Sequence, residues 1–390
     1  MKNPIFEISK KSQKGVEDFS STFSKEILDD ICFKLTGKTD YDIRFDDAGY
    51  NRGRLAKLIL ADETHYITIS PTVAKGRNSW FQSVSTAFGD FFRDPQEKKS
   101  LNYYIINSVK GINTPYHQFM YRLMITSGFK FLNGDEFGIS PIRFNSVQDL
   151  ILSKESIRGK NSSNNSSFVT ISEDNVTQVY AKTYGANKKE SVLLCIAISF
   201  IQNSPLQLIQ FKEGNLELLP DIDLKLIAKL IDLETVIADK QYEKDEFVQN
   251  NSLRSKTYIY NLLDKFGHKK CAMCKCSIPE IIQGAHIWPV SSIKKSNHND
   301  DIKVQHAINK DNGLWLCENH HKLFDRNILA INNLGEILKK NNTIQEYNDY
   351  IMETTTINKI DRSHITNQFL EYVNLRNENL DITNFINASS

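Results

Sequence analysis

The sequence predicts an α+β protein with an N-terminal region of mixed helices and strands over residues 1–245 and a C-terminal domain over residues 246–390. Three observations lead to this prediction. The chain has 390 residues, more than one typical domain contains. Apolar residues recur with helical spacing in some segments and alternate as in strands in others. Cysteines and histidines with the spacing of metal ligands are concentrated in one C-terminal segment.

Apolar patterns define the elements expected in the first part of the N-terminal region. Apolar residues recur every three or four positions over residues 17–36, which predicts a helix. Residues 65–69 alternate between apolar and polar side chains, as a strand does. The aromatic-rich segment 80–92 predicts an amphipathic helix that contributes to the core, and residues 103–109 predict a further strand or helix segment.

A polar run separates this part from the next. Residues 160–167 contain only Lys, Asn and Ser, so we expect an exposed loop and place an additional boundary near residues 156–167. The elements expected after the run are, in order, strands at 168–172 and 177–184, a buried helix or strand at 191–201, and an amphipathic helix at 222–237.

The C-terminal domain is expected to fold around a metal-binding core over residues 265–335. A helix predicted within residues 246–270 leads into the first cysteine pair. The run N-I-L-A-I-N after Asp325 predicts a strand, and residues 364–387 predict a helix and tail.

Two cysteine-containing pairs predict a structural zinc site. Cys271 and Cys274 are separated by two residues, a spacing that lets both thiolates reach one tetrahedral ion. Cys317 and His320 repeat that spacing and would complete a Cys3His site. Cys276 is an alternative to Cys274, although a Cys-x-Cys spacing is tighter.

The same segment resembles the HNH endonuclease family, whose fold is a β-hairpin and a helix around a divalent metal ion. The resemblance covers roughly residues 265–335. It rests on the two zinc knuckles and on three further positions. His286 in G-A-H-I-W-P, Asn312 in D-N-G-L-W-L-C, and His321 directly after the second knuckle match the H, N and H positions of the family.

The resemblance implies a phosphodiester hydrolase. A neutral imidazole can accept the proton of an attacking water, and we assign this role to His286. A divalent ion would stabilise charge on the phosphate, with His321 and Asp325 as candidate ligands on one helix face. Asn312 would orient His286 through the hairpin backbone or bind the ion directly.

One position departs from the family pattern. Many members carry a histidine or aspartate ligand just before the general base, whereas this chain has Ala285. Either a ligand is missing or Asp325 supplies it; we favour Asp325. His321 is also an alternative to His320 as the zinc ligand.

Composition and charge limit the function classes. The chain contains no apolar run of transmembrane length and no signal-peptide pattern at its N-terminus, and its cysteines suit a reducing cytoplasm. The formal net charge is only +1, but residues 251–310 contain ten Lys or Arg and four acidic residues. This basic stretch flanks the candidate site, as expected for contact with a phosphate backbone.

The resulting prediction is a bacterial cytoplasmic Type II restriction endonuclease with a recognition region before its HNH domain. It would cleave double-stranded DNA with Mg²⁺ or a similar ion, keep a structural Zn²⁺, and act as a homodimer. A cognate DNA methyltransferase acting on the same site would be its functional partner. Two alternatives are a nuclease that recognises methylated DNA and a non-catalytic, zinc-stapled DNA-binding protein.

Overall fold

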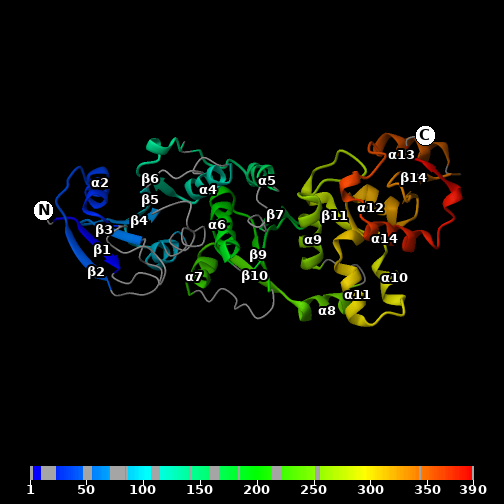
Figure 1. Cartoon of the computed structure of the whole chain (residues 1–390), viewed down its shortest axis with the longest axis horizontal. Helices are drawn as coiled ribbons and strands as arrows, with labels where there is room; N and C mark the ends of the chain where they lie inside the picture. Colours follow the sequence, from blue (N-terminus) through cyan, green and yellow to red (C-terminus); the bar gives the residue numbers. More distant parts are fainter. Residues whose placement is uncertain are drawn as a thin grey trace. The chain divides into compact units, whose positions relative to one another are not determined.

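The computed structural model in Figure 1 describes residues 3–9, 23–46, 55–70, 84, 87–106, 115–139, 142–158, 167–182, 185–212, 222–250, 255–341 and 344–388. The chain forms two compact units. The first comprises residues 1–167, 181–208 and 213–235, and the second comprises residues 168–180, 209–212 and 236–390. The architecture is α+β, as the sequence predicts. Most of the boundary expected at 156–167 lies outside the described residues.

A mixed six-stranded sheet with the order β2-β1-β3-β4-β5-β6 lies in the first unit. β1 runs parallel to β2 and antiparallel to β3, and β4, β5 and β6 run parallel to one another. The strands are β1 (Ile5–Ser9), β2 (Asp42–Asp46), β3 (Leu55–Ile59), β4 (Thr64–Ser70), β5 (Lys99–Ile105) and β6 (Phe129–Phe131). The strand expected at 65–69 is therefore confirmed as β4, and β5 covers part of the segment expected at 103–109.

Helix α2 (Lys25–Thr36) connects the parallel strands β1 and β2, a pairing that requires a crossover. The Ser24 hydroxyl caps its N-terminus, and Gly37 ends it with a φ of 72°, the left-handed conformation that glycine adopts without strain. Its buried face joins a core cluster that also contains Phe6 and Ile8 of β1. The earlier residues of the helix expected at 17–36 are mostly outside the described ranges.

The first unit also contains helices α4 (Pro115–Thr126), α5 (Val147–Ser156) and α6 (Gly185–Ile201). A helical segment over 87–93 overlaps the helix expected at 80–92. α4 packs against α6. Lys154 of α5 forms a buried ion pair with Glu190 of α6, whose carboxylate also accepts hydrogen bonds from Tyr116 and Ser167. Glu190 therefore ties α4, α5, α6 and the residue before β7 together.

A separate four-stranded sheet has the order β10-β9-β8-β7. It comprises β7 (Phe168–Ile171), β8 (Thr177–Lys182), β9 (Leu206–Phe211) and β10 (Leu233–Ala238). The helix expected at 222–237 is wrong in its second half, because α7 (Ile222–Leu230) ends there and the chain turns at Asp232, with φ of 51°, into β10. The β-branched run Thr235, Val236 and Ile237 favours a strand over the amphipathic helical pattern.

An antiparallel hairpin is the framework of the second unit. β11 (Ile282–His286) pairs with β12 (Gly313–Cys317), and α12 (Glu318–Asp325) follows directly. Helices α10 (Val290–Lys295) and α11 (Asp300–Ile308) lie between the two strands in sequence. His286 pairs with Gly313 and Ile282 with Cys317, so His286 and Cys317 lie at opposite ends of the hairpin, roughly 13 Å apart along the strands.

Further elements surround the hairpin. Helices α8 (Lys240–Gln249) and α9 (Lys256–Phe266) precede it, in place of the single helix expected within 246–270. After α12 come a three-stranded sheet, β13 (Leu329–Ile331), β14 (Ile337–Lys340) and β15 (Phe385–Asn387), and helices α13 (Gln345–Thr354) and α14 (Asn367–Asn377). β13 confirms the strand expected after Asp325.

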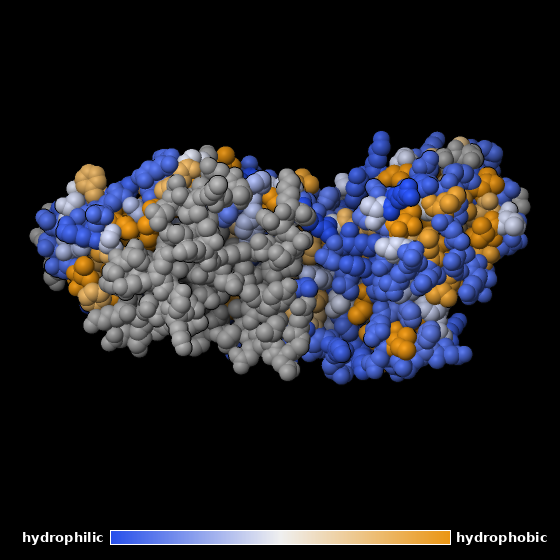
Figure 2. Space-filling model, viewed as in Figure 1, coloured by the Kyte–Doolittle hydropathy of each residue, from blue (hydrophilic) through white to orange (hydrophobic). Residues whose placement is uncertain are grey.

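The core of the second unit is continuous through these elements. Trp315 of β12, Phe324 of α12 and Phe369 of α14 are almost completely buried in one cluster. On the face shown in Figure 2 the surface of this unit is mostly hydrophilic, with apolar patches between the polar residues. In the described part of the chain, no helix is both long and apolar enough to span a bilayer.

Candidate functional site

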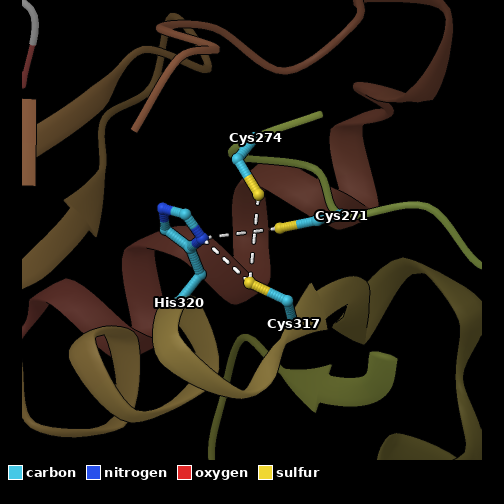
Figure 3. A group of neighbouring side chains, drawn as sticks. All are labelled: Cys271, Cys274, Cys317 and His320. Atoms are coloured by element: carbon cyan, nitrogen blue, oxygen red, sulfur yellow. Dashed lines mark hydrogen bonds between the residues drawn. The ribbon is translucent and has the colours of Figure 1, made fainter. Parts of the chain in front are cut away.

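Four side chains of the second unit converge on one point at one end of the hairpin. Cys271 and Cys274 lie in the loop after α9, Cys317 ends β12, and His320 lies in the first turn of α12. Figure 3 shows the three sulfur atoms and the imidazole turned toward one another. Their ligand atoms, one per residue, all lie within 4.8 Å of one another.

The distances between these atoms fit a tetrahedral zinc ion. Nδ1 of His320 lies 3.1 Å from Sγ of Cys317 and 3.6 Å from Sγ of Cys271. The Sγ atoms of Cys274 and Cys317 are 3.9 Å apart. Zinc–sulfur bonds of about 2.3 Å place two sulfurs of a tetrahedral site roughly 3.8 Å apart. The Cys3His group can therefore hold Zn²⁺.

Contacts outside the four ligands orient this site. The amide of Ala272 donates to the Trp315 carbonyl at 2.8 Å and ties the cysteine loop to β12. Nε2 of His320 lies 3.2 Å from Oγ1 of the buried Thr355, after α13. With Nε2 protonated and donating to Thr355, Nδ1 of His320 presents its lone pair to the thiols, which is the tautomer that a metal ligand needs.

The two alternative ligands lie differently. The amide of Cys276 lies 3.5 Å from Sγ of Cys274 and the Cys276 carbonyl accepts from the amide of Cys271, so Cys276 shapes the loop through its backbone. His321 contacts Asp325 instead of the cysteines. Among the described residues, Cys271, Cys274, Cys317 and His320 make up the one group of three or more potential ligands.

His286 lies at the other end of the hairpin, as the last residue of β11. Its Nε2 lies 2.8 Å from the carbonyl of Ala307 in α11, to which it donates. Its ring stacks on Tyr258 of α9, with centroids 4.1 Å apart and planes inclined by 11°. Burial lowers the pKa of His286 to about 4, against the opposing effect of the Ala307 carbonyl. The imidazole is therefore neutral at pH 7, and its Nδ1 can accept a proton.

Asn312 holds the chain around His286 in place. Its Oδ1 accepts a hydrogen bond from the Trp288 amide at 2.7 Å, and its Nδ2 lies 3.2 Å from the Trp288 carbonyl and 3.1 Å from the His306 carbonyl. The side chain is completely buried. These bonds fix residues two positions after His286 and one before Ala307, so the arrangement favours the orienting role over direct metal binding.

His321 and Asp325 lie one turn apart on α12. Nδ1 of His321 is 3.1 Å from Oδ2 of Asp325, and the side chain of Asp325 is half exposed. α12 packs against β11, the strand that ends at His286, so the pair lies on a helix next to the strand that carries the candidate base. Ala285 is completely buried and offers no ligand atom. A divalent ion held here would take its remaining ligands from water or phosphate oxygens.

Residues 271–332 match the family model described as HNH endonuclease. This segment is an HNH endonuclease domain. It contains both zinc knuckles and all three positions assigned to the H, N and H pattern, so the resemblance drawn from the sequence is confirmed for this segment. No curated protein matches the chain. The HNH domain supports nuclease activity on DNA with a divalent metal ion.

Tyr258 supports the HNH domain from outside the matched segment, and sequence reasoning missed it. Its hydroxyl lies 3.1 Å from the Ala285 carbonyl and 3.4 Å from the Asn312 carbonyl. Gly284 and Gly313 leave no room for a Cβ beside Tyr258 and Leu262. Gly313 has an extended backbone, so the glycine is needed here for the close packing of α9 on the hairpin and not for a turn.

Part of the basic stretch around the HNH domain is not available to DNA. Lys265 pairs with Asp311 at 2.9 Å and only 8% of its side chain is exposed. Lys269 is buried, with its Nζ 2.8 Å from the Ile171 carbonyl. Lys310 pairs with Asp264 on the surface. The expected phosphate contacts at these positions are therefore wrong for Lys265 and Lys269, whose charges are used inside the fold.

Proposed function

We propose that the protein is a sequence-specific Type II restriction endonuclease that hydrolyses double-stranded DNA. The observation that carries the proposed chemistry is the setting of His286: its imidazole is held by the Ala307 carbonyl and stacks on Tyr258, and it ends the strand β11, against which α12 with His321 and Asp325 packs. Because its pKa is lowered, the imidazole is in its neutral, proton-accepting form at neutral pH.

In the proposed reaction, Nδ1 of His286 accepts a proton from a water molecule while the water oxygen attacks phosphorus. The bond to the 3′ oxygen breaks, that oxygen takes a proton from solvent water, and the products are a 5′-phosphate and a 3′-hydroxyl. Bound Mg²⁺ or a similar ion would stabilise the charge that develops on the phosphate and the leaving oxygen. His321 and Asp325 would hold that ion, and Asn312 would keep His286 in place.

The remaining parts of the proposal concern the whole protein. Residues 1–245 would recognise the DNA sequence, because a small HNH domain does not by itself select a site. Two copies of the chain would cut the two strands of a symmetric site. A methyltransferase of the same specificity would protect the host DNA, and the protein would act in the bacterial cytoplasm.

Digestion of unmethylated phage DNA by the zinc-loaded protein with Mg²⁺, with and without EDTA, tests this proposal. Discrete fragments that require Mg²⁺ would support it, and end sequencing would identify the site. A smear would contradict sequence specificity. Cleavage of methylated DNA alone would replace the proposal with modification-dependent cleavage, and no cleavage of either DNA would favour the non-catalytic alternative.

Two substitutions connect the activity to the candidate base. We expect His286→Ala to reduce the cleavage rate by at least about 10²-fold, the lower range for loss of a general base, without a change in DNA affinity. His364→Ala, in the same unit but with its ring tilted against Phe266, serves as the control and should cut normally. Normal cleavage by His286→Ala would remove it from the mechanism.

A further inference from the structure

We propose that Arg376 is a positioning residue that fixes the end of β11, which carries His286, to the end of α12, which carries Asp325. The proposal rests on the nuclease function proposed above. It assigns a role to α14, which lies outside the segment that matches the HNH family model.

The contacts of the guanidinium group carry the proposal. Nη1 of Arg376 donates to the Ile287 carbonyl at 3.1 Å. Nη2 donates to the Phe324 carbonyl and, at 2.9 Å, to Oδ1 of Asn327. Ile287 directly follows His286, and Phe324 directly precedes Asp325. One side chain thus joins the backbone beside the candidate base to the backbone beside the candidate metal ligand.

The surroundings of Arg376 restrict its movement. The residue is only 6% exposed, and its guanidinium lies 3.7 Å from the centroid of the Phe324 ring. A planar guanidinium offers several N–H donors in a rigid fork, so it can bind two carbonyls in a fixed relation, which a lysine ammonium on a flexible stem cannot do equally well.

The positive charge of Arg376 lies at the C-terminal end of α12. The Phe324 carbonyl is among the last carbonyls of α12, where the helix dipole and the lack of intrahelical donors favour a cation. Asn327 follows with a φ of 54°, and its amide donates to the same carbonyl at 2.9 Å. Arg376 therefore binds the point at which α12 ends, one residue from Asp325, and it does so from another helix.

The neighbouring residue supplies a matched control. Asn377 also lies in α14, and its Nδ2 donates to the Ile331 carbonyl of β13 at 2.9 Å. Asn377→Ala removes a hydrogen bond that docks the same helix, but it leaves the bonds to Ile287 and Phe324 in place. Comparison of Asn377→Ala with the Arg376 variants therefore separates weaker docking of α14 as a whole from loss of the specific bonds to Ile287 and Phe324.

The experiment compares full-length, zinc-loaded wild type, Arg376→Met, Arg376→Lys and Asn377→Ala. Hydrogen exchange would be followed in peptides covering residues 282–290 and 320–328, and kcat and KM would be measured for DNA cleavage at saturating Mg²⁺. We expect Arg376→Met to exchange faster in both segments and to lose about 10- to 100-fold in kcat, as expected for a displacement of about 1 Å, with little change in KM. Arg376→Lys should lie between wild type and Arg376→Met, and Asn377→Ala should match wild type in both segments.

Two results would overturn the proposal. One is exchange in Arg376→Met that matches wild type in both segments. The other is an equal effect of Asn377→Ala on exchange and kcat, which would mean that α14 acts only through general stability. If Arg376→Met does not fold, Arg376→Lys takes its place in the comparison. A wild type that cleaves no DNA would refute the nuclease function, and the exchange data would still decide whether Arg376 positions the two segments.

Discussion

A single methyl group at position 313 should disturb the packing of Tyr258 beneath His286. Gly313 has φ −154° and ψ 163°, an extended conformation that alanine also adopts, so Gly313→Ala causes no backbone strain. The added Cβ would overlap the Tyr258 hydroxyl and lie 2.9 Å from Cζ of Tyr258 and 2.7 Å from Cδ2 of Leu262. Tyr258 must therefore move, and it loses its contacts with the Ala285 and Asn312 carbonyls.

The expected magnitude follows from these contacts. Overpacking a core typically costs about 1–3 kcal/mol, and each lost hydrogen bond costs about 1 kcal/mol. We expect Gly313→Ala to lower the free energy of unfolding by about 3 kcal/mol and Tyr258→Phe to lower it by about 1 kcal/mol. Because Tyr258→Phe removes the overlapping oxygen, the double variant should lose about 1–2 kcal/mol less than the sum of the single variants.

The assay is urea unfolding of the zinc-loaded chain followed by tryptophan fluorescence, since two of the three tryptophans, Trp288 and Trp315, lie in the second unit. Gly284→Ala is the comparison variant: its Cβ would lie 2.7 Å from Cδ1 of Leu262 and 3.0 Å from the Tyr258 ring. The coupling free energy between Gly284→Ala and Tyr258→Phe should be smaller than that between Gly313→Ala and Tyr258→Phe. The reason is that the Cβ added at position 284 meets Leu262 and the Tyr258 ring, and not the Tyr258 hydroxyl. Strict additivity for Gly313→Ala and Tyr258→Phe would refute the argument.

Three other predictions concern the metals and pH. Cys274→Ser should abolish stoichiometric zinc binding measured by atomic absorption, whereas Cys276→Ser should retain it; the reverse result would exchange their roles. Asp325→Asn should raise the Mg²⁺ concentration needed for half-maximal cleavage by at least about tenfold. Glu318→Gln, on the same helix, should leave this concentration unchanged. An unchanged concentration for Asp325→Asn would mean that Asp325 is not a ligand. Burial lowers the pKa of His286 from 6.5 to about 4, so its base form persists as pH falls. The single-turnover cleavage rate should therefore stay flat from pH 8 to about pH 6, and a decline centred near pH 6.5 would contradict this environment.

The zinc-ligand candidates were accessible from the sequence because the spacing within each pair is local, whereas His286 and Asn312 were assigned through the resemblance to the HNH family. Two residues between Cys271 and Cys274, and the same interval between Cys317 and His320, constrain geometry whatever the rest of the chain does. The structure brings these four together, as the spacing predicts. The placement of His321 and Asp325 on one face of α12 likewise follows from helical periodicity alone.

The supporting residues were not accessible in this way. Tyr258, Thr355 and Arg376 act on positions that are far away in sequence, and their own neighbourhoods contain no pattern that identifies a partner. Lys265 and Lys269 were expected to contact DNA because they lie in a basic stretch, and their partners in the fold are also distant in sequence. A lysine in a basic stretch is usually exposed, but here a carboxylate and backbone carbonyls compensate for burial.

The segment 222–237 illustrates the limit for secondary structure. Its apolar spacing suits a helix throughout, and α7 occupies only the first part. β10 forms because its residues pair with β9 in a sheet, and such pairing partners cannot be read from a local window.

The second unit includes segments from before α7, and this affects how fragments of the protein should be designed. Residues 168–180 and 209–212 belong to the same unit as the HNH domain, although both precede α7. Phe168 and Phe211 pack on Tyr260 of α9, with ring centroids 5.4 Å and 4.6 Å apart. A fragment starting at residue 246 would expose that aromatic surface to water. The HNH domain therefore cannot be moved to another protein as residues 246–390 alone. A fusion of these residues to a foreign DNA-binding protein should aggregate, because the aromatic surface around Tyr260 would be exposed.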